Sequence, residues 1–502
     1  MTIMNKVSIA GSGGGEQQQH VPVEASDTLH SRQMITAVDL IGEGEIGGLV
    51  DGAKSIYLNN IPLVNADGLS NFTYTEANVT NGSLTSVNVP WEFRSGGQSQ
   101  DLFTLEGYDG VEVPHLMSSQ VKQGYPVMVS VNTQTVDAVR LTVTVPALMS
   151  QDSSTGDTNG SSVSYSFDVS TNGGSYSDSG LGVIVITGKT RSHYQRTHLI
   201  TLPKPGNTWS IRMNRITADS TSSLLQNDLY FDSYSEITNT KLSYPNSAMV
   251  AMRLDSQQFS SVPTRSYLVD GLYIKVPTNY DAATRVYTGV WDGTFKVAVS
   301  SNPAWVLYDL LTSSRYGLGK YVGAEQVDKA MLYTIGRYCD ELVSDGYGGF
   351  EPRFSINTSF QSRMDAYKLI SDVTSVFRGM SYWNGGMVSF TQDSPTDPSY
   401  IYNSANVVDG IFQYTGSALK DRHSVVLVTW NDPLQKYQQQ IEYVEDVSLI
   451  TQFGVRQTEV VAVGCTSRGQ AHRVGKWILL SEQQESEMIT YKVGIDRSKS
   501  VV

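Results

Sequence analysis

One short stretch near the carboxyl end, GCTSRGQAHRVGKWILL at residues 464–480, holds the side chains from which a reactive site could be built. Cys465 is one of two cysteines in the chain, and His472 follows seven residues later. A thiol and an imidazole within hydrogen-bond reach form a nucleophile and its base, and the same pair can ligate a metal ion. Which chemistry applies depends on the elements that carry the two residues.

Patterns on either side of the cysteine predict two different elements. Alternation in TEVVAVGC places Cys465 on the apolar face of a strand, together with Val461 and Val463. Ser467 with Gln470 three residues later is a capping-box pattern, which begins a helix. His472 then lies about 9 Å along the axis from the cysteine, at roughly 1.5 Å per residue. Because that separation is too long for a hydrogen-bonded pair, a catalytic or metal site is disfavoured here.

A second arrangement in this stretch is a basic edge. Arg468, His472 and Lys476 recur every four residues and therefore share one side of the predicted helix. The chain has 36 Lys and Arg against 49 Asp and Glu, a formal net charge of −13. In such a protein the edge either contacts an acidic surface, on this subunit or the next, or is solvated. We take these three residues as a candidate subunit-contact edge.

Acidic pairs elsewhere in the sequence are weaker candidates. Glu43 and Glu45 in GEGEI could be a glycosidase pair, but two acids in a glycine-rich turn are more typical of solvent-facing charge. Asp152 and Asp157 lie in the polar loop 149–162, where their spacing misses the EF-hand template for calcium. We expect a solvated loop.

The remaining motifs do not indicate an enzyme. His193 and His198, five apart in strand-like sequence, point to opposite faces. The sequence contains no HExxH zinc helix, no GxSxG elbow and no P-loop. Cys339 lies beside an apolar helical stripe, which predicts a buried thiol. We therefore expect no catalytic residues, no metal ligands and no cofactor.

Composition sets the broad class. A chain of 502 residues is expected to form several domains, and 28 Tyr with 44 Gly favour strands and turns. The negative charge argues against a general nucleic-acid binder, and two cysteines exclude a disulfide framework. The amino-terminal stretch MTIMNKVSIAGSGGG is a poor signal peptide, and no apolar run approaches the roughly 20 residues that cross a bilayer.

Hydrophobic periodicity changes along the chain. Segments such as AVRLTVTV, VSYSFDVS and WSIRMNRIT alternate apolar and polar residues, as the strands of a β-sandwich do. After residue 300 helices are predicted, with Asn302 as a cap before Pro303 and a capping box from Ser362 to Asp365.

These patterns divide the chain into expected parts: a flexible arm (1–35), a discontinuous β-rich unit (36–99 and 231–300), an inserted sandwich (100–230), an α+β unit (301–400), and a β-barrel or sheet unit (401–502) with a helix at 467–481.

Several long runs resemble one family. They include HVPVEASDTLHSRQ, DLIGEGEIGGLVDGAKSIYLN, YPNSAMVAMRLDSQQF, VPTNYDAATRVYTGVWDGTFK, NPAWVLYDLLTSSRYGLGK, SALKDRHSVVLVTWNDP and GCTSRGQAHRVGKW. In order and over nearly the whole chain, they resemble the host-specificity, or tip attachment, protein J of lambda- and HK97-like siphophages.

The resemblance implies a multidomain β-rich fold with α+β parts, in which tail-hub β-barrel domains carry an inserted fibronectin-III-like sandwich. It implies a structural virion protein at the distal hub and cone of a long non-contractile tail. Such a protein closes the tail tube, carries the central fibre for host receptor attachment, and opens for DNA ejection.

The implied partners are two further copies in a homotrimer, neighbouring tail-tip proteins and the tape-measure protein in the lumen, with DNA only in transit. Localisation would be the virion tail tip, after assembly in the host cytoplasm. Members of the family continue past the last residue of this chain, so a host outer-membrane receptor would be bound by a C-terminal region beyond residue 502. Two other functions stay open: a tail-tip glycan or peptidoglycan hydrolase, and a pure host-surface adhesin.

Overall fold

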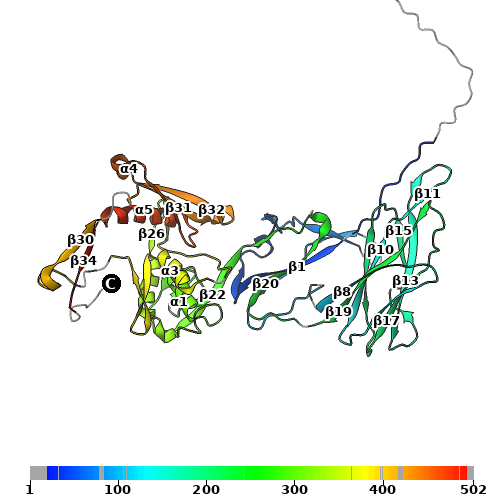
Figure 1. The fold of residues 1–502 in the computed structure, drawn as a ribbon, viewed down its shortest axis with the longest axis horizontal. Helices are drawn as coiled ribbons and strands as arrows, with labels where there is room; N and C mark the ends of the chain where they lie inside the picture. Colours follow the sequence, from blue (N-terminus) through cyan, green and yellow to red (C-terminus); the bar gives the residue numbers. More distant parts are fainter. Residues whose placement is uncertain are drawn as a thin grey trace, which may run out of the picture.

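The computed structural model describes residues 20–494 except 32, 78–83, 106, 109, 241, 260, 363, 396, 398–399, 417–421 and 486. The molecule is elongated: a β-sandwich lies at one end, a sheet built around β1 and β20 follows, and the helices and the last strands lie at the other end (Figure 1). Among the described residues, no helix has the length and apolar character needed to span a membrane.

The sandwich confirms the prediction of an inserted fibronectin-III-like domain. One sheet has the order β16-β10-β19-β8, and the other has the order β14-β13-β17-β9 with β15 paired to β13. Along β17 every second residue, from Trp209 to Arg215, is buried, which is the alternation read in the sequence. The bounds are β8 Gly110–Gln120, β9 Val127–Val131, β10 Ala138–Val145, β13 Ser161–Thr171, β14 Ser177–Asp178, β15 Ile184–Gly188, β16 Tyr194–Thr201, β17 Trp209–Arg215 and β19 Tyr230–Asn239. A small sheet of β11 (Met149–Gln151), β12 (Thr158–Asn159) and β18 (Leu225–Gln226) extends one end.

Segments from before and after the sandwich pair with each other in the middle of the molecule. Strand β20 (Ser247–Asp255) lies between β1 (Met34–Glu43) and β7 (Trp91–Ser95), antiparallel to both. Its buried side chains pack with Ile56 and Leu58 of β3 (Ile56–Leu58), which lies between β4 (Ile61–Pro62) and β21 (Arg265–Tyr267). The hydroxyl of Tyr108 donates to the carbonyls of both β1 and β20, at 2.8 and 2.6 Å, and so ties the linker into the sandwich to this sheet. Hairpin strands β5 (Thr73–Ala77) and β6 (Leu84–Asn88) lie between β4 and β7 in the sequence.

Three helices and several hairpins form the next unit. Helix α1 (Pro303–Thr312) begins as predicted, since the Asn302 side chain accepts from the amide of Ala304 at 2.9 Å. Helix α3 (Ala366–Val376) begins later than expected, because its cap is Asp365 itself and not Ser362. The buried Cys339 lies in α2 (Lys329–Asp340), within the core. The strands are β2 (Ile46–Leu49), β22 (Val269–Pro277), β23 (Tyr280–Asp281), β24 (Val286–Tyr287), β25 (Phe295–Val299), β26 (Leu342–Ser344), β27 (Phe350–Pro352), β28 (Gly379–Asn384) and β29 (Met387–Gln392).

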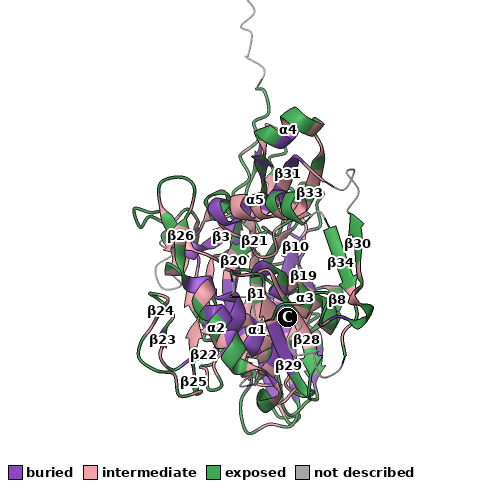
Figure 2. Ribbon diagram, turned by 90° about the vertical axis from the view of Figure 1, so that its left-hand side faces the viewer, coloured by how far each residue is buried: buried purple, intermediate pink, exposed green. Residues whose placement is uncertain are grey.

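The last unit is a three-stranded sheet covered by a helix. Strand β31 (Val425–Asp432) runs antiparallel to β32 (Gln438–Glu445) and parallel to β33 (Gln457–Val461). Helix α5 (Arg468–Gln484) packs on this sheet, and the short helix α4 (Val447–Phe453) connects β32 to β33. A separate ribbon of β30 (Phe412–Gly416) and β34 (Glu487–Tyr491) carries mostly exposed residues, whereas α1, α2 and β29 carry buried ones (Figure 2).

The expected amino-terminal arm differs from the prediction where it is described. Residues 1–19 lie outside the described part, but residues 20–31 are hydrogen-bonded to one end of the sandwich. No sequence pattern predicted these contacts, because they come from backbone groups and isolated charges that have no periodicity.

Candidate functional site: helix α5 and its acidic partners

Helix α5 begins where the sequence predicts, but only half of the expected capping box forms. The hydroxyl of Ser467 accepts from the amide of Gln470 at 3.2 Å. The Gln470 side chain does not return to the cap. It is buried, accepts from the amide of Ser355 at 2.9 Å and donates to the carbonyl of the same residue at 3.0 Å. A long-range backbone contact therefore replaces the local bond.

The predicted face shared by Val461 and Cys465 is wrong. Strand β33 ends at Val461, whose side chain is exposed, and a turn follows in which the amide of Cys465 donates to the carbonyl of Ala462 at 3.2 Å. The turn directs the Cys465 side chain into the core between the sheet and α5, where Cys465 is 1% exposed. Burial raises the pKa of the Cys465 thiol to about 11, so it is protonated at neutral pH.

Cys465 and His472 do not form a pair. The Cys465 sulfur lies 3.2 Å from the carbonyl oxygen of Ser467, whereas His472 directs its Nδ1 to the carboxylate of Glu442 at 3.0 Å. Within the part of the chain that the structure describes, no cluster of three or more His, Cys, Asp and Glu side chains could hold a metal ion.

The basic edge of α5 faces the edge strand of its own sheet. Glu442 of β32 is 4% exposed and accepts from Arg468 Nε at 2.7 Å and from Tyr347 OH at 2.9 Å, in addition to its contact with His472. Lys476 donates to the carbonyl of Glu445 on the same strand at 2.7 Å. The structure thus brings all three predicted residues together on β32.

Glu442 is a buried carboxylate surrounded by donors. Burial opposes its ionisation, but the hydrogen bonds from Arg468, His472 and Tyr347 outweigh burial and hold the pKa of Glu442 below its ordinary value. The Arg468 guanidinium also lies 4.5 Å from the centre of the Tyr347 ring and remains more than half exposed. Glu442 therefore joins α5 to β32 and to the loop that carries Tyr347.

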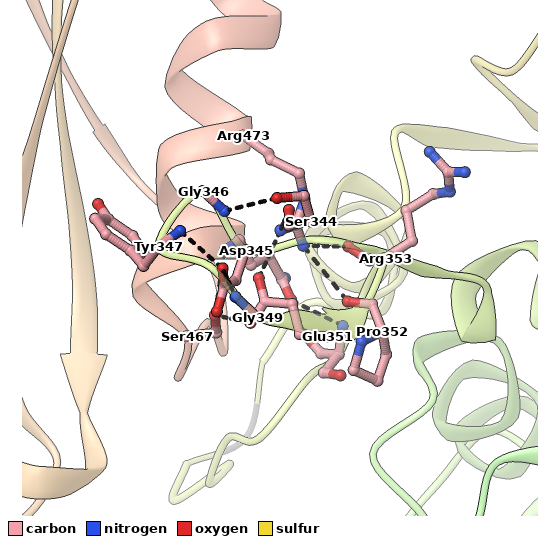
Figure 3. Close-up of polar contacts among 12 residues, drawn as sticks. Ser344, Asp345, Gly346, Tyr347, Gly349, Glu351, Pro352, Arg353, Ser467 and Arg473 are labelled. Carbon is pink, nitrogen blue, oxygen red and sulfur yellow. Dashed lines mark hydrogen bonds and ion pairs between the residues drawn. The ribbon is translucent and has the colours of Figure 1, made fainter.

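A second carboxylate binds the start of the helix (Figure 3). Glu351 of β27 accepts from Arg473 Nη1 at 2.5 Å and from the hydroxyl of Ser467. Arg473 also donates to the carbonyl of Arg353 at 2.9 Å. A Cβ at Gly469 would lie 2.5 Å from the Glu351 carboxylate, so the hairpin approaches the helix backbone closely. The β26–β27 hairpin thereby clamps the first turns of α5.

The loop of this hairpin is shaped by Asp345. Its Oδ1 accepts from the amides of Tyr347 at 2.7 Å and Gly349 at 2.9 Å, and these backbone bonds lower the pKa of Asp345 (Figure 3). The turn positions Tyr347 against Glu442 and Arg468.

Sequence reasoning missed the acidic partners of the helix. Glu442 and Glu351 lie 26 and 116 residues from the α5 groups that they bind, so no spacing rule connects them. Arg473 was visible as a charge, but its role depends on a hairpin far away in the sequence. The only local signal was an excess of cations on a helix in an acidic chain.

Of the other candidate acids, Glu43, Asp152 and Asp157 have partners within the chain. Glu43 pairs with Arg315 at 2.5 Å. Asp152 accepts from the hydroxyl and amide of Ser154 and from the next amide, and these bonds lower its pKa to about 2. Asp157 accepts from the amide of Val23 at 2.7 Å. The loop at 149–162 therefore holds the amino-terminal segment in place.

The two histidines in the sandwich also differ in environment. His198 points into the core, where its Nε2 lies 2.8 Å from the hydroxyl of Tyr165, and burial lowers its pKa to about 4. His193 is exposed, and its carbonyl accepts from Ser31 at 3.1 Å. The predicted opposite orientation agrees with these positions.

Comparisons with known proteins match two parts of the fold. The family model described as "Tip attachment protein J, FNIII-A domain" matches residues 111–240, which coincide with β8 to β19. A model described as "Putative phage tail protein" matches residues 365–501, which include α3 and α5. A chain in the X-ray structure of the entire lipid-containing bacteriophage PM2 aligns with 46% of this chain and 75% of its own length, at 10% sequence identity and a TM-score of only 0.18.

Two curated relatives match almost the whole chain. Tip attachment protein J of Escherichia phage SECphi27 is 37% identical over 494 residues, which are 98% of this chain and 40% of the relative. The protein of the same name from Escherichia phage SECphi4 is 34% identical over 501 residues, 99% of this chain and 42% of the relative. The chain thus spans less than half the length of these relatives. The chain is therefore similar over nearly its whole length to phage tip attachment proteins J, and its sandwich matches the FNIII-A domain model of these proteins.

Proposed function

We propose that this chain is a structural part of the tip of a long non-contractile phage tail. It forms the hub that closes the tail tube, carries the central fibre that attaches to the host, and opens for DNA ejection. The observation that supports this most is the similarity, over 98% and 99% of the chain, to two proteins named for attachment at the tip.

The partners are part of the same proposal. Three copies form the hub, neighbouring tail-tip proteins and the tape-measure protein contact it, and a host outer-membrane receptor is bound through the part of the relatives that this chain does not span. DNA passes through without being held, which suits a chain of net charge −13 that repels phosphate. The chain is assembled in the host cytoplasm and then resides in the virion.

The ribbon of β30 and β34 supports an assembly role. Phe412, Tyr414, Ile489 and Tyr491 lie on one face, because Phe412 pairs with Tyr491 and Tyr414 with Ile489 across the ribbon. Tyr414 is 63% and Ile489 is 47% exposed, and the buried core clusters contain neither of them. Tyr402 packs on Tyr491 at a ring-centroid distance of 4.8 Å, but among the described residues Tyr414 and Ile489 stay exposed. A two-stranded ribbon with an exposed apolar face is marginally stable alone in water, so a neighbouring copy is the proposed cover.

A phage with a nonsense codon in the gene, grown with and without the intact gene supplied in trans, tests the proposal. On a non-suppressing host we expect filled heads without infectious tails, and on complementation we expect antibody against residues 111–240 to label the distal tail end in electron micrographs. Normal tails without the chain, or label on the head or along the tube, would overturn the tip assignment.

Two measurements separate this function from the alternatives. A tail-tip hydrolase would release glycan or peptidoglycan fragments, and one carboxylate substitution would abolish the release while tails still assemble. A pure adhesin would allow antibody against the sandwich to block adsorption while chains lacking the sandwich still assemble into tails. The hub proposal predicts neither outcome.

A further inference from the structure

The amino-terminal segment at residues 20–31 is bound along one end of the sandwich in an extended conformation. The backbone of Thr158 both donates to and accepts from the segment, at 2.9 Å in each case. The carbonyl of Lys189 accepts two further amides of the segment, at 2.9 and 3.1 Å. Main-chain pairing at two separate places fixes the register of the segment on the sandwich, as in strand addition.

The same surface carries a buried cation that the segment neutralises. The Lys189 side chain is 3% exposed, and its ammonium donates to Glu24 at 2.7 Å and Asp27 at 2.6 Å. Arg191 adds a third ion pair, to Glu24 at 2.6 Å. A buried ammonium is costly unless it is paired, and both of its described anionic partners lie on the segment. The sandwich therefore holds a charge for which the segment supplies the counter-ions.

The shape of the surface also fits the segment. A Cβ at Gly188 would lie 2.7 Å from Thr28 Oγ1 and 2.8 Å from Leu29 Cγ, and a Cβ at Gly156 would lie 3.0 Å from Pro22. Leu29 packs against the core of the sandwich. Because Gly188 and Gly156 have no side chains, the sandwich leaves the space that the segment occupies. We call this contact surface, which includes Lys189, the groove.

The position of the groove gives the contact a mechanical consequence. The sandwich joins the rest of the chain through β8 and β19, whose ends at Gly110 and Asn239 pair with each other. Two connections at one point leave a hinge. Residues 20–31 precede β1, which begins at Met34, and they bind the sandwich at Thr158 and Lys189, away from the Gly110–Asn239 pair (Figure 1). They therefore form a third connection between the sandwich and the rest of the chain.

We propose that residues 20–31 are a clasp that fixes the orientation of the sandwich relative to the β1–β20–β7 sheet, and that the groove around Lys189 is its dedicated binding site. The occupant is the chain's own segment, which is extended and supplies two carboxylates. This inference concerns the shape of the single chain and does not depend on the proposed function.

Distances between two spin labels on the 502-residue chain test the clasp. One label is placed at Ser175→Cys in the sandwich and the other at Ser266→Cys in β21, both at exposed positions, while the native cysteines are buried. We expect one narrow distance distribution in the parent chain and a distribution at least twice as broad in Lys189→Met, because the apolar side chain keeps the packing and loses both ion pairs.

Two further variants keep this result interpretable. The double variant Glu24→Gln/Asp27→Asn leaves the sandwich untouched and should broaden the distribution in the same way. Lys204→Met is the matched control, because its ammonium contacts Gln134, Val136 and Asp137 of the sandwich itself, and it should leave the distribution narrow. Unchanged widths in both clasp variants would overturn the proposal.

Cysteine trapping tests whether the clasp acts within one chain. Pro22→Cys with Gly156→Cys, without labels, should form a disulfide inside a monomer on oxidation, because the two positions are in contact. The intrachain product should migrate as a monomer in non-reducing electrophoresis. A product that joins two chains would overturn the intramolecular clasp and assign the groove to the segment of a second copy.

Discussion

At the scale of single residues, Glu442 determines what the basic edge of α5 does. Three donors from two elements converge on one carboxylate that is 4% exposed. A buried charge is retained when hydrogen bonds and opposite charges replace its lost water, and Arg468, His472 and Tyr347 do so here. Arg468, His472 and Lys476, which the sequence suggested as a subunit-contact edge, thus bind groups of their own chain.

Removal of the Glu442 charge should loosen α5. The variant Glu442→Gln retains the shape but leaves Arg468 and His472 without their carboxylate, and we expect a loss of about 1–3 kcal/mol in the free energy of local opening. Amide hydrogen exchange of residues 468–480 measures it. Glu445→Gln is the control, since Lys476 binds the backbone carbonyl of that residue, and its exchange should match the parent chain. Equal protection in the two variants would contradict the role of Glu442.

The same group predicts a pH dependence with a definite sign. The pKa of Glu442 is lowered in the folded chain, so the unfolded chain binds its proton at higher pH than the folded chain does. The stabilisation is therefore complete above the unfolded pKa of about 4.3 and is lost as pH falls through the folded value. Exchange protection in the parent chain and in Glu442→Gln should differ at pH 6, and the difference should shrink as the pH falls below about 4.3 and vanish only below the folded pKa. A difference that grows on acidification would contradict this.

At the scale of elements, packing of α5 on β32 depends on a close approach at Gly475. A Cβ on that glycine would lie 2.6 Å from Val444 Cγ2, so the helix backbone rests directly against the strand. The neighbouring hairpin makes a similarly close approach at Gly469. The helix is therefore held from two sides by elements that come from different parts of the sequence.

The variant Gly475→Val should separate α5 from its sheet. The added side chain overlaps Val444, and overpacking of this kind costs roughly 1–3 kcal/mol. We expect a lower thermal midpoint and faster exchange in α5. Gly271→Ala is the control, because a Cβ there would meet no heavy atom within 4 Å. If Gly475→Val melted at the same temperature as this control, the close contact would be refuted.

At the scale of the whole molecule, the apolar face of the β30–β34 ribbon differs from the other apolar faces, because it does not pack into a buried core. Five buried clusters account for the folded units, and none contains a residue of this ribbon. Apart from the contact of Tyr402 with Tyr491, this face is exposed among the described residues at Tyr414 and Ile489. Exposed apolar surface of this kind favours association, because it leaves water when two copies meet.

Polar substitution of that face should weaken self-association. In sedimentation velocity experiments we expect concentration-dependent oligomers of the parent chain and a shift of at least tenfold in midpoint concentration for Tyr414→Ser/Ile489→Ser. The opposite-face control is Thr415→Ser/Thr490→Ser, which should behave as the parent chain does. A parent chain that stays monomeric at all concentrations, with its tail partners added, would contradict the assembly proposal as well.

Features that depend on residues close together in the sequence could be predicted from the sequence alone. Alternation over 209–215 predicted β17 and the sandwich, Asn302 predicted the start of α1, and Ser467 predicted the start of α5, because side-chain periodicity and capping act within a few residues. The resemblance to phage tip attachment proteins J also followed from the sequence, and two such proteins are 37% and 34% identical over nearly the whole chain.

Only the tertiary structure decided what the charged residues contact. Glu442 meets Arg468 across 26 residues, and Glu24 meets Lys189 across 165. Such partners are set by how strands and loops are brought together, and no local pattern encodes them. The turn after Val461 likewise buries Cys465 by redirecting the chain. The sequence by itself determined the main elements and the resemblance to tip attachment proteins J. Long-range packing decided that the basic edge binds its own sheet and that the amino-terminal segment binds the sandwich.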